Sequence, residues 1–140
     1  MKVCLGQINT TPGDFAGNLA AIRAGIERAD SGGCDVVLFP ELCLPGYLSQ
    51  DLLYHTAYID RNLATLEQVR HMTQACDPGL HVVVGYVERN HGRGKPFFNM
   101  AAVIAGGKIL GTYAKQLIPF YDVFDELRYF APGTELLVLE

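Results

Sequence analysis

The sequence predicts an α/β layered fold with a mixed sheet. Short apolar runs that suit strands alternate with segments in which apolar residues recur at helical spacing. The pair Gly106-Gly107 between two further apolar runs predicts a two-residue hairpin, so the sheet must contain an antiparallel pair. The expected order is strand, helix, strand, helix, strand, hairpin, irregular segment and strand.

The first predicted strand is Val3–Ile8, and a turn at Pro12 and Gly13 follows it. A helix is expected next, because apolar residues recur three or four positions apart and Gly32-Gly33 then provides a stop signal. Its apolar face would consist of Leu19, Ile22, Ile26 and Ala29. The second predicted strand, Asp35–Phe39, is a nearly continuous apolar run, which suits a strand covered on both faces.

The middle of the chain predicts a second helix and a third strand. Ser49 is expected to cap a short helical turn that runs to Leu53. A longer helix should follow and end at Asp77-Pro78-Gly79, before the third strand, His81–Glu88. The apolar face of that helix would consist of Ile59, Leu63, Leu66, Val69 and Thr73.

The last part of the chain begins with the predicted hairpin, whose strands are Met100–Ala105 and Lys108–Lys115. An irregular segment rich in aromatic residues then extends to Gly133, and Glu135–Glu140 is expected to start another strand. Because the sequence stops inside that expected strand, we expect the chain to be part of a longer protein.

Composition narrows the classes of function. The net charge of −4 over 140 residues argues against nucleic acid or an anionic membrane surface as the main partner. No apolar run approaches the roughly 20 residues that span a bilayer, and the N-terminus has no signal-peptide pattern, so a cytoplasmic location is expected. The four cysteines and four histidines show no metal-ligand spacing, so no metal site is predicted.

Glu41 and Lys115 are the side chains that could carry chemistry. Glu41 follows the second predicted strand, and α/β folds place their sites at the carboxyl ends of strands. A helix cap or a surface ion pair is an equally good interpretation of this residue. A buried carboxylate requires a cationic partner, and Lys115 at the end of the last hairpin strand is the best candidate, although alone it would be an exposed lysine.

The segment Tyr121–Gly133 places four aromatic residues among three acidic ones. Loops of this length without regular structure are uncommon unless they are functional. The alternative is a surface loop that aromatic residues anchor.

Three segments together, PELCLPGY, YAKQ and PFYDVFDELRYFAPG, resemble the nitrilase superfamily of carbon–nitrogen hydrolases. The run KQLIPFYDVFDELRYFAPG is similar to the N-terminal glutaminase domain of glutamine-dependent NAD synthetases. The resemblance covers essentially the whole chain. It implies that residues 1–140 are the N-terminal part of such a domain, an α-β-β-α sandwich with mixed sheets that is incomplete in this chain. The rest of the domain and a synthetase domain would lie beyond the chain.

The resemblance also implies a catalytic triad of glutamate, lysine and cysteine. Glu41 matches the general base and Lys115 matches the catalytic lysine. The family's nucleophilic cysteine lies in the strand after the APG motif, and none of the four cysteines matches it, since Cys43 falls in the family's turn. The chain alone is therefore expected to be inactive.

Four more residues match the family's site. Tyr47, Tyr121 and Phe124 match aromatic positions that line the glutamine pocket, and Glu126 matches an auxiliary glutamate. Each of the four could instead be purely structural. One departure is Phe120-Tyr121-Asp122, where relatives often carry Asn-Tyr-Gly.

The implied activity is hydrolysis of glutamine to supply ammonia for the ATP-dependent amidation of nicotinic acid adenine dinucleotide to NAD. ATP and Mg²⁺ would bind the downstream synthetase domain, with no cofactor in this chain, and association into a homo-oligomer is expected. Two alternatives stay open: a standalone nitrilase-type amidase or carbamoylase, and a non-catalytic interaction module of the same fold.

Overall fold

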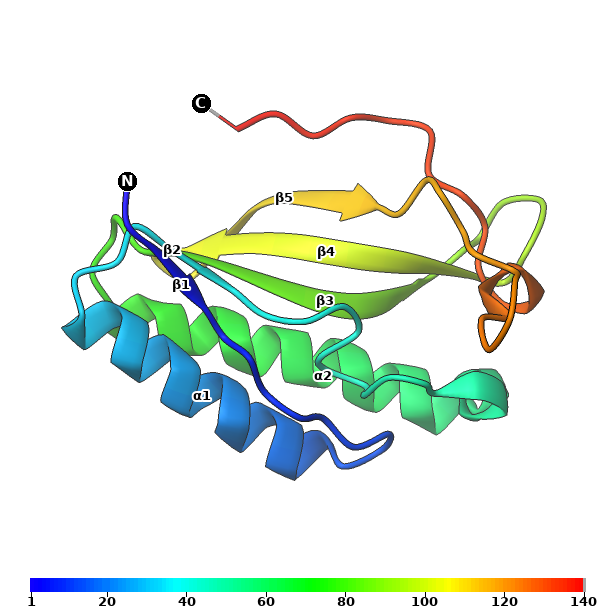
Figure 1. Ribbon diagram of the computed structural model, residues 1–140, viewed down its shortest axis with the longest axis horizontal. Helices are drawn as coiled ribbons and strands as arrows, with labels where there is room; N and C mark the ends of the chain where they lie inside the picture. The colour runs from blue at the N-terminus through cyan, green and yellow to red at the C-terminus, as the bar shows by residue number, and fades with distance from the viewer. Residues whose placement is uncertain (140) are drawn as a thin grey trace.

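The computed structural model describes residues 1–139 as a five-stranded sheet with two helices on one face (Figure 1). The strands are β1 (Val3–Leu5), β2 (Val36–Leu38), β3 (His81–Arg89), β4 (Phe97–Ala105) and β5 (Lys108–Ala114), and they lie side by side in that order. The pairs β1–β2 and β2–β3 are parallel, and the pairs β3–β4 and β4–β5 are antiparallel. The predicted α/β fold with a mixed sheet is confirmed.

The two helices, α1 (Phe15–Ser31) and α2 (Thr56–Met72), connect the parallel strands. Crossovers between parallel strands are almost always right-handed, so two successive crossovers in one direction place both helices on the same face. The side chain of Asp14 caps α1 by accepting a hydrogen bond of 2.9 Å from the backbone nitrogen of Gly17. The helix ends at Gly32, and Gly33 follows at a φ of 61°. Both predicted helices are confirmed.

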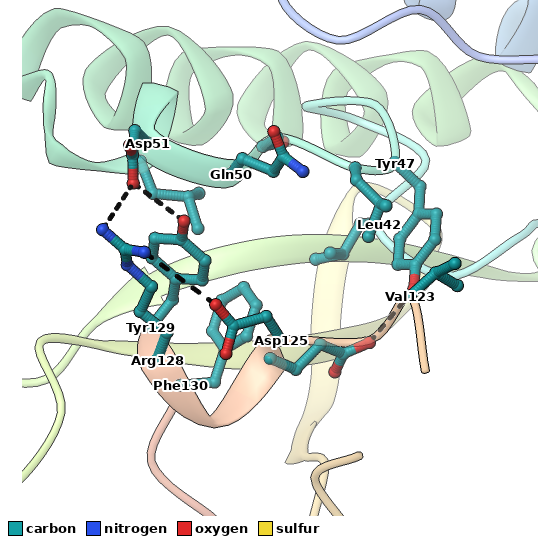
Figure 2. Close-up of a pocket in the computed structure, with 13 residues that line it drawn as sticks. Leu42, Tyr47, Gln50, Asp51, Val123, Asp125, Arg128, Tyr129 and Phe130 are labelled. Carbon is teal, nitrogen blue, oxygen red and sulfur yellow. Dashed lines mark hydrogen bonds and ion pairs between the residues drawn. The ribbon is translucent and has the colours of Figure 1, made fainter. Parts of the chain in front are cut away.

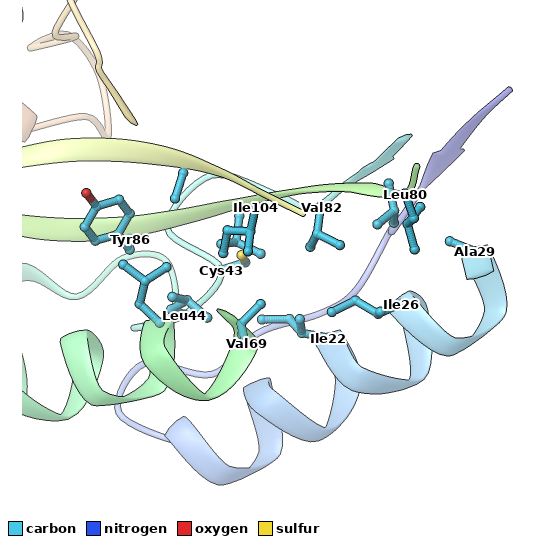
Figure 3. Close-up of a cluster of buried hydrophobic side chains, with 14 residues drawn as sticks. Ile22, Ile26, Ala29, Cys43, Leu44, Val69, Leu80, Val82, Tyr86 and Ile104 are labelled. Atoms are coloured by element: carbon cyan, nitrogen blue, oxygen red, sulfur yellow. The ribbon is translucent and has the colours of Figure 1, made fainter. Parts of the chain in front are cut away.

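The main core lies between the sheet and the two helices (Figure 3). Ile22 and Ile26 of α1 and Val69 of α2 pack there against Val82 and Ile104 of the sheet. Because these side chains are buried at the expected helical and strand spacing, their burial holds α1, α2 and the sheet together.

The hairpin between β4 and β5 forms as predicted. Gly106 has a φ of 53° and Gly107 a φ of 76°, the backbone region that glycine adopts without steric cost. Ala105 pairs with Lys108 across the turn. The turn sets the register next to it, and a bulge between the pairs Ile104–Ile109 and Val103–Gly111 shifts that register by one residue, so that Lys115 comes to lie beside Asn99 near the start of β4.

The face of the sheet away from the helices is largely open over residues 1–139, and Leu137 lies over it at Gly111 of β5. On this face Leu5 is 66% exposed and Leu38 39%. The prediction that Asp35–Phe39 is covered on both faces is therefore wrong for this chain, because both helices lie on the other face. The strand itself is shorter, Val36–Leu38. One helical layer and one sheet of the expected sandwich are present in the described residues.

The final strand predicted at Glu135–Glu140 is also wrong for residues 135–139, and Glu140 lies outside the described residues. The chain runs extended over the open face beside β5 (Figure 1), and the side chain of Gln116 donates a hydrogen bond of 3.0 Å to the carbonyl of Glu135. A strand exists only where a neighbour completes the backbone ladder, and within residues 1–139 this segment has none.

Smaller differences occur in the turns. β1 ends at Leu5 rather than at Ile8. Ser49 precedes the short 3₁₀ helix Gln50–Tyr54, but its hydroxyl donates a hydrogen bond of 2.7 Å to the carbonyl of Gly46 instead of capping that helix. Neither α1 nor α2, nor any other helix within residues 1–139, is long and apolar enough to cross a membrane.

Candidate active site

Glu41 lies in the bend that follows β2, and this bend packs directly on β3. The backbone nitrogen of Leu44 donates a hydrogen bond of 3.1 Å to the carbonyl of Gly85 in β3. A Cβ atom on Gly85 would collide with the backbone of Leu42 and lie 3.0 Å from the carbonyl carbon of Glu41. A glycine in β3 is therefore what lets the bend approach the sheet and hold Glu41 at its edge.

Lys115 directly follows β5, and its ammonium group binds two carboxylates. The Nζ atom lies 2.9 Å from Oε1 of Glu41 and 2.9 Å from Oε2 of Glu126. The structure thus brings together the pair that the sequence predicted, Glu41 and Lys115, and adds the predicted auxiliary residue Glu126. Three residues far apart in the chain meet at one end of the sheet.

Glu126 begins the short 3₁₀ helix Glu126–Arg128, and its side chain is 4% exposed. Besides Lys115, it accepts hydrogen bonds of 3.4 Å from the hydroxyl of Tyr47 and 3.4 Å from the amide of Asn99. Since a buried carboxylate is costly without donors, these three partners account for its burial.

Asn99 of β4 is the site residue that the sequence reasoning missed. It is 3% exposed, and its Nδ2 atom donates a hydrogen bond of 2.6 Å to Oε1 of Glu41. A signal was present, because Asn99 is a lone amide within an otherwise apolar strand. A buried amide needs hydrogen-bond partners, but the sequence does not say which.

The charges of this cluster shift two titrations. Partial burial acts to lower the pKa of Lys115, but hydrogen bonds to Glu41 and Glu126 outweigh it and raise that pKa above the ordinary lysine value. Burial, together with the negative charges of Glu126 and Glu41, raises the pKa of the Tyr47 phenol to about 12. Lys115 therefore stays an ammonium, and Tyr47 stays protonated, throughout the neutral range.

Tyr121 and Phe124 lie apart from this cluster. Tyr121 is 66% exposed, and the two rings contact each other edge to face with centroids 5.4 Å apart. Tyr121 and Lys115 both line one shallow hollow. Among the aromatic residues proposed for the pocket, Tyr47 is the one that contacts a carboxylate of the cluster.

Two further hollows border the cluster. One lies between the segments 47–53 and 123–130, where the Tyr47 hydroxyl reaches the side chain of Glu126 (Figure 2). The hydroxyl of Tyr129 donates a hydrogen bond of 2.8 Å to Asp51 at its other end. The second hollow lies on the open face of the sheet and is bordered by Glu41, Lys115 and Tyr113. A substrate could therefore reach Glu41 and Lys115 from the open face.

Cys43 stands two residues from Glu41 but faces the other way. Its thiol is buried in the main core, and the backbone nitrogen of Gly85 donates a hydrogen bond of 3.3 Å to the sulfur. Burial raises the pKa of this thiol to about 12, so it remains protonated and a poor nucleophile. The other three cysteines, Cys4, Cys34 and Cys76, pack against the same core. Within residues 1–139, no group of three or more His, Cys, Asp or Glu side chains is arranged to hold a metal ion.

A carboxylate beside a fixed ammonium can serve amide chemistry. The carboxylate can take a proton from an attacking nucleophile and return it to the leaving amine. The ammonium can stabilise negative charge that develops on the attacked carbonyl oxygen, an effect typically worth a few kcal/mol.

Comparison with known proteins points in the same direction. The family model described as carbon–nitrogen hydrolase matches residues 2–139. The glutamine-dependent NAD(+) synthetase of Thermotoga maritima is 39% identical over 140 residues, which is 100% of this chain and 23% of that protein. The corresponding enzyme of Aquifex aeolicus is 36% identical, with 24% of its length covered. The chain thus spans about a quarter of the length of the curated relatives it matches.

Solved structures share the fold. The glutamine-dependent NAD+ synthetase of Acinetobacter baumannii, in complex with ADP, superposes with a TM-score of 0.82 at 29% identity, over 99% of this chain and 25% of that one. An amidase from Nesterenkonia sp. superposes with a TM-score of 0.78 at 24% identity, over 96% of this chain and 49% of that one. At that identity the amidase shows a shared fold alone.

Proposed function

The chain belongs to the carbon–nitrogen hydrolase family, and on that premise we propose that residues 1–140 form the first part of a glutaminase domain. That domain would hydrolyse the side-chain amide of glutamine to glutamate and ammonia. The observation that carries the proposal is the position of Lys115, whose Nζ atom lies 2.9 Å from Glu41 and 2.9 Å from the buried Glu126. An ion pair with a purely structural role would need only one carboxylate on Lys115. Amide hydrolysis needs the cation next to a second carboxylate that can act as a base, and Glu41 takes that place.

Each of the three charged residues has a role in the proposed reaction. Glu41 takes the proton of a cysteine thiol as the sulfur attacks the amide carbon, and later gives it to the departing ammonia. Lys115 stabilises the oxyanion that forms on the carbonyl oxygen. Glu126 keeps Lys115 in place and charged.

The nucleophilic cysteine is proposed to come from the part of the protein that follows residue 140. The burial of Cys43, and the packing of the other three cysteines against the main core, support this assignment. The same part would cover the open face of the sheet and so complete the sandwich and the substrate pocket, to which Tyr47, Tyr121 and Phe124 are proposed to contribute. The chain alone is accordingly expected to be inactive.

We further propose that the ammonia serves the synthesis of NAD by a synthetase domain. The similarity to glutamine-dependent NAD(+) synthetases over the whole of this chain supports that assignment. The ATP and Mg²⁺ of that domain, a homo-oligomeric state and a cytoplasmic location stay predictions.

The proposal is tested by measuring ammonia release from glutamine by the full-length gene product, by its Glu41→Gln variant and by the 140-residue chain. Glu27→Gln is a matched control, because it makes the same chemical change on the exposed side of α1. Release by the full-length product and by the control, but not by Glu41→Gln or by the short chain, is expected.

Two results would count against the proposal. Full activity in Glu41→Gln would leave this glutamate with a structural role. No release of ammonia from glutamine by the full-length product, but hydrolysis of another amide, would favour a standalone amidase or carbamoylase.

A further inference from the structure

We propose that Asn99 is a positioning residue of this site, which keeps the two carboxylates ionised and commits one oxygen of Glu41 to binding so that the other exchanges the proton. This inference rests on the proposed glutaminase function. It adds a residue that contacts no reacting atom but acts through Glu41 and Glu126.

Asn99 touches every charged member of the cluster. Its Nδ2 atom lies 2.6 Å from Oε1 of Glu41 and 3.4 Å from Oε2 of Glu126. Its backbone carbonyl accepts a hydrogen bond of 2.8 Å from the backbone nitrogen of Lys115. A single residue of β4 therefore orients the base, the auxiliary carboxylate and the start of the lysine.

The amide of Asn99 has one suitable orientation. Its neighbours are two carboxylates, which accept hydrogen bonds when ionised, so the NH₂ group rather than the carbonyl oxygen must face them. Because Asn99 is 3% exposed, its side chain cannot turn to water instead. The two hydrogens of one NH₂ group match the two carboxylate oxygens.

The need for such a donor follows from the charges. Glu41 and Glu126 each lie 2.9 Å from the single ammonium group of Lys115, so the ionised cluster carries one net negative charge. Two carboxylates that share one cation repel each other, and this repulsion favours protonation of one of them. A protonated Glu41 could not act as a base. Asn99 stabilises the ionised form of both carboxylates without adding a charge of its own.

The contacts also separate the two oxygens of Glu41. Lys115 and Asn99 both donate to Oε1, at 2.9 Å and 2.6 Å. Within residues 1–139, Oε2 accepts no hydrogen bond, and the side chain is 44% exposed. The proton therefore passes through Oε2. The thiol S–H bond breaks as an Oε2–H bond forms, and that bond breaks in turn as the nitrogen of the leaving ammonia gains the proton and the C–N bond is cleaved.

The titratable groups that face Glu41 come from three other segments. Lys115 follows β5, and Tyr113 within β5 borders the same hollow as Glu41. Glu126 lies in the 3₁₀ helix Glu126–Arg128, and Tyr47 follows the bend after β2. Lys115 and Tyr47 keep their protons across the neutral range, as argued above. Asn99 contacts both Glu41 and Glu126, so its removal is read out on the acid limb of the pH profile.

The test compares Asn99→Leu with a matched control, Asn62→Leu, in the full-length gene product. Asn62 is also a fully buried asparagine, and it bonds both the nitrogen and the carbonyl of Val87, the residue that pairs with Asn99 across β3 and β4. Both substitutions replace a buried asparagine by a leucine of nearly the same size, Asn99 in β4 itself and Asn62 in α2, where it packs against β3. Only Asn99→Leu removes a hydrogen-bond donor from carboxylates, because Asn62 bonds backbone groups.

The expected kinetic result is a displaced acid limb. In Asn99→Leu the limb of kcat/KM against pH moves upward by about one unit, so the loss is about tenfold on the acid side and small above pH 8, with KM unchanged. Asn62→Leu leaves the limb where it is in the wild type. Equal limbs in wild type and Asn99→Leu would overturn the inference.

A second measurement does not depend on activity. The melting temperature of Asn99→Leu should lie further below that of the wild type at pH 8 than at pH 3, below the ordinary range of a glutamate, because protonated carboxylates no longer need the donor. For Asn62→Leu the deficit should be the same at both pH values. A pH-independent deficit in Asn99→Leu would show that Asn99 merely joins strands. A wild type that does not release ammonia from glutamine refutes the proposed function, and the melting temperatures then still decide whether Asn99 holds the carboxylates ionised.

Discussion

Replacing Lys115 by methionine is expected to destabilise the chain by about 3 kcal/mol at pH 8 and by less than about 1 kcal/mol at pH 4. Methionine keeps the length of the side chain and much of its apolar stem. The substitution removes the ammonium that lies 2.9 Å from each of two carboxylates.

The magnitude comes mainly from Glu126. Its side chain is 4% exposed, and removing one partner of a buried pair costs about 3–5 kcal/mol. Glu41 is 44% exposed, so its share is no more than about 1 kcal/mol. Because Lys115 itself is 26% exposed, water can replace part of the stabilisation that its ammonium group gives the carboxylates. The total loss of stability therefore lies near the lower end of the range of about 3–5 kcal/mol.

The assay is urea denaturation of the wild-type chain, of Lys115→Met and of the double variant Lys115→Met/Glu126→Gln at both pH values. The double variant should recover most of the stability at pH 8, since a neutral amide at position 126 needs no counter-charge. An equal loss at pH 8 and pH 4, or no recovery in the double variant, would show that Lys115 does not compensate the charge of Glu126. In the wild type the raised pKa of Lys115 also makes the stability of the fold depend on alkaline pH. Its contribution is complete below the ordinary lysine value of 10.5 and disappears as the pH rises through the higher folded value.

Three other substitutions or reactions test neighbouring parts of the account. Gly85→Ala should destabilise the chain by about 2 kcal/mol or more and displace Glu41, because the added Cβ meets the bend after β2; a melting temperature equal to the wild type would contradict this. Asn62→Ala should cost about 2–3 kcal/mol in urea denaturation, because the nitrogen and carbonyl of Val87 lose their partners; a loss below about 0.5 kcal/mol would mean that water replaces the amide. Cys43 should resist iodoacetamide at pH 8 in the native chain and react only in denaturant, because its thiol is buried with a pKa of about 12; rapid alkylation of the native chain, mapped by mass spectrometry, would show that the bend is open.

The elements that the sequence predicted well are those whose signals are local. Helix α1 has its apolar spacing and its stop signal at Gly32-Gly33 within one stretch of sequence, and the hairpin is specified by Gly106-Gly107. The pairing of Glu41 with Lys115 was predicted from the need of a buried carboxylate for a cation. The pair forms, but Glu41 is 44% exposed, and the buried carboxylate that Lys115 binds is Glu126. No periodicity was required for that argument.

What the sequence could not predict depends on the register and on partners outside the segment concerned. Asn99 reaches Glu41 because β4 pairs with β3 so that Val87 lies opposite Asn99, and strand periodicity alone does not set that register. The expected strand at Glu135 has the right residues, but over residues 135–139 it has no neighbour to complete a ladder. The apolar run that contains Leu38 predicted a strand covered on both faces. Apolar character alone does not reveal whether another part of the protein covers a residue, and Leu38 is exposed in this chain.

The most direct test of the central claim, that Glu41 and Lys115 serve glutamine hydrolysis, is NAD formation by the full-length Glu41→Gln variant with two nitrogen sources. With ammonium chloride the variant should form NAD at the wild-type rate, because the proposed synthetase domain is untouched. With glutamine it should form almost none. Wild-type rates with both nitrogen sources would contradict the account, because Glu41 would then have no part in releasing ammonia from glutamine.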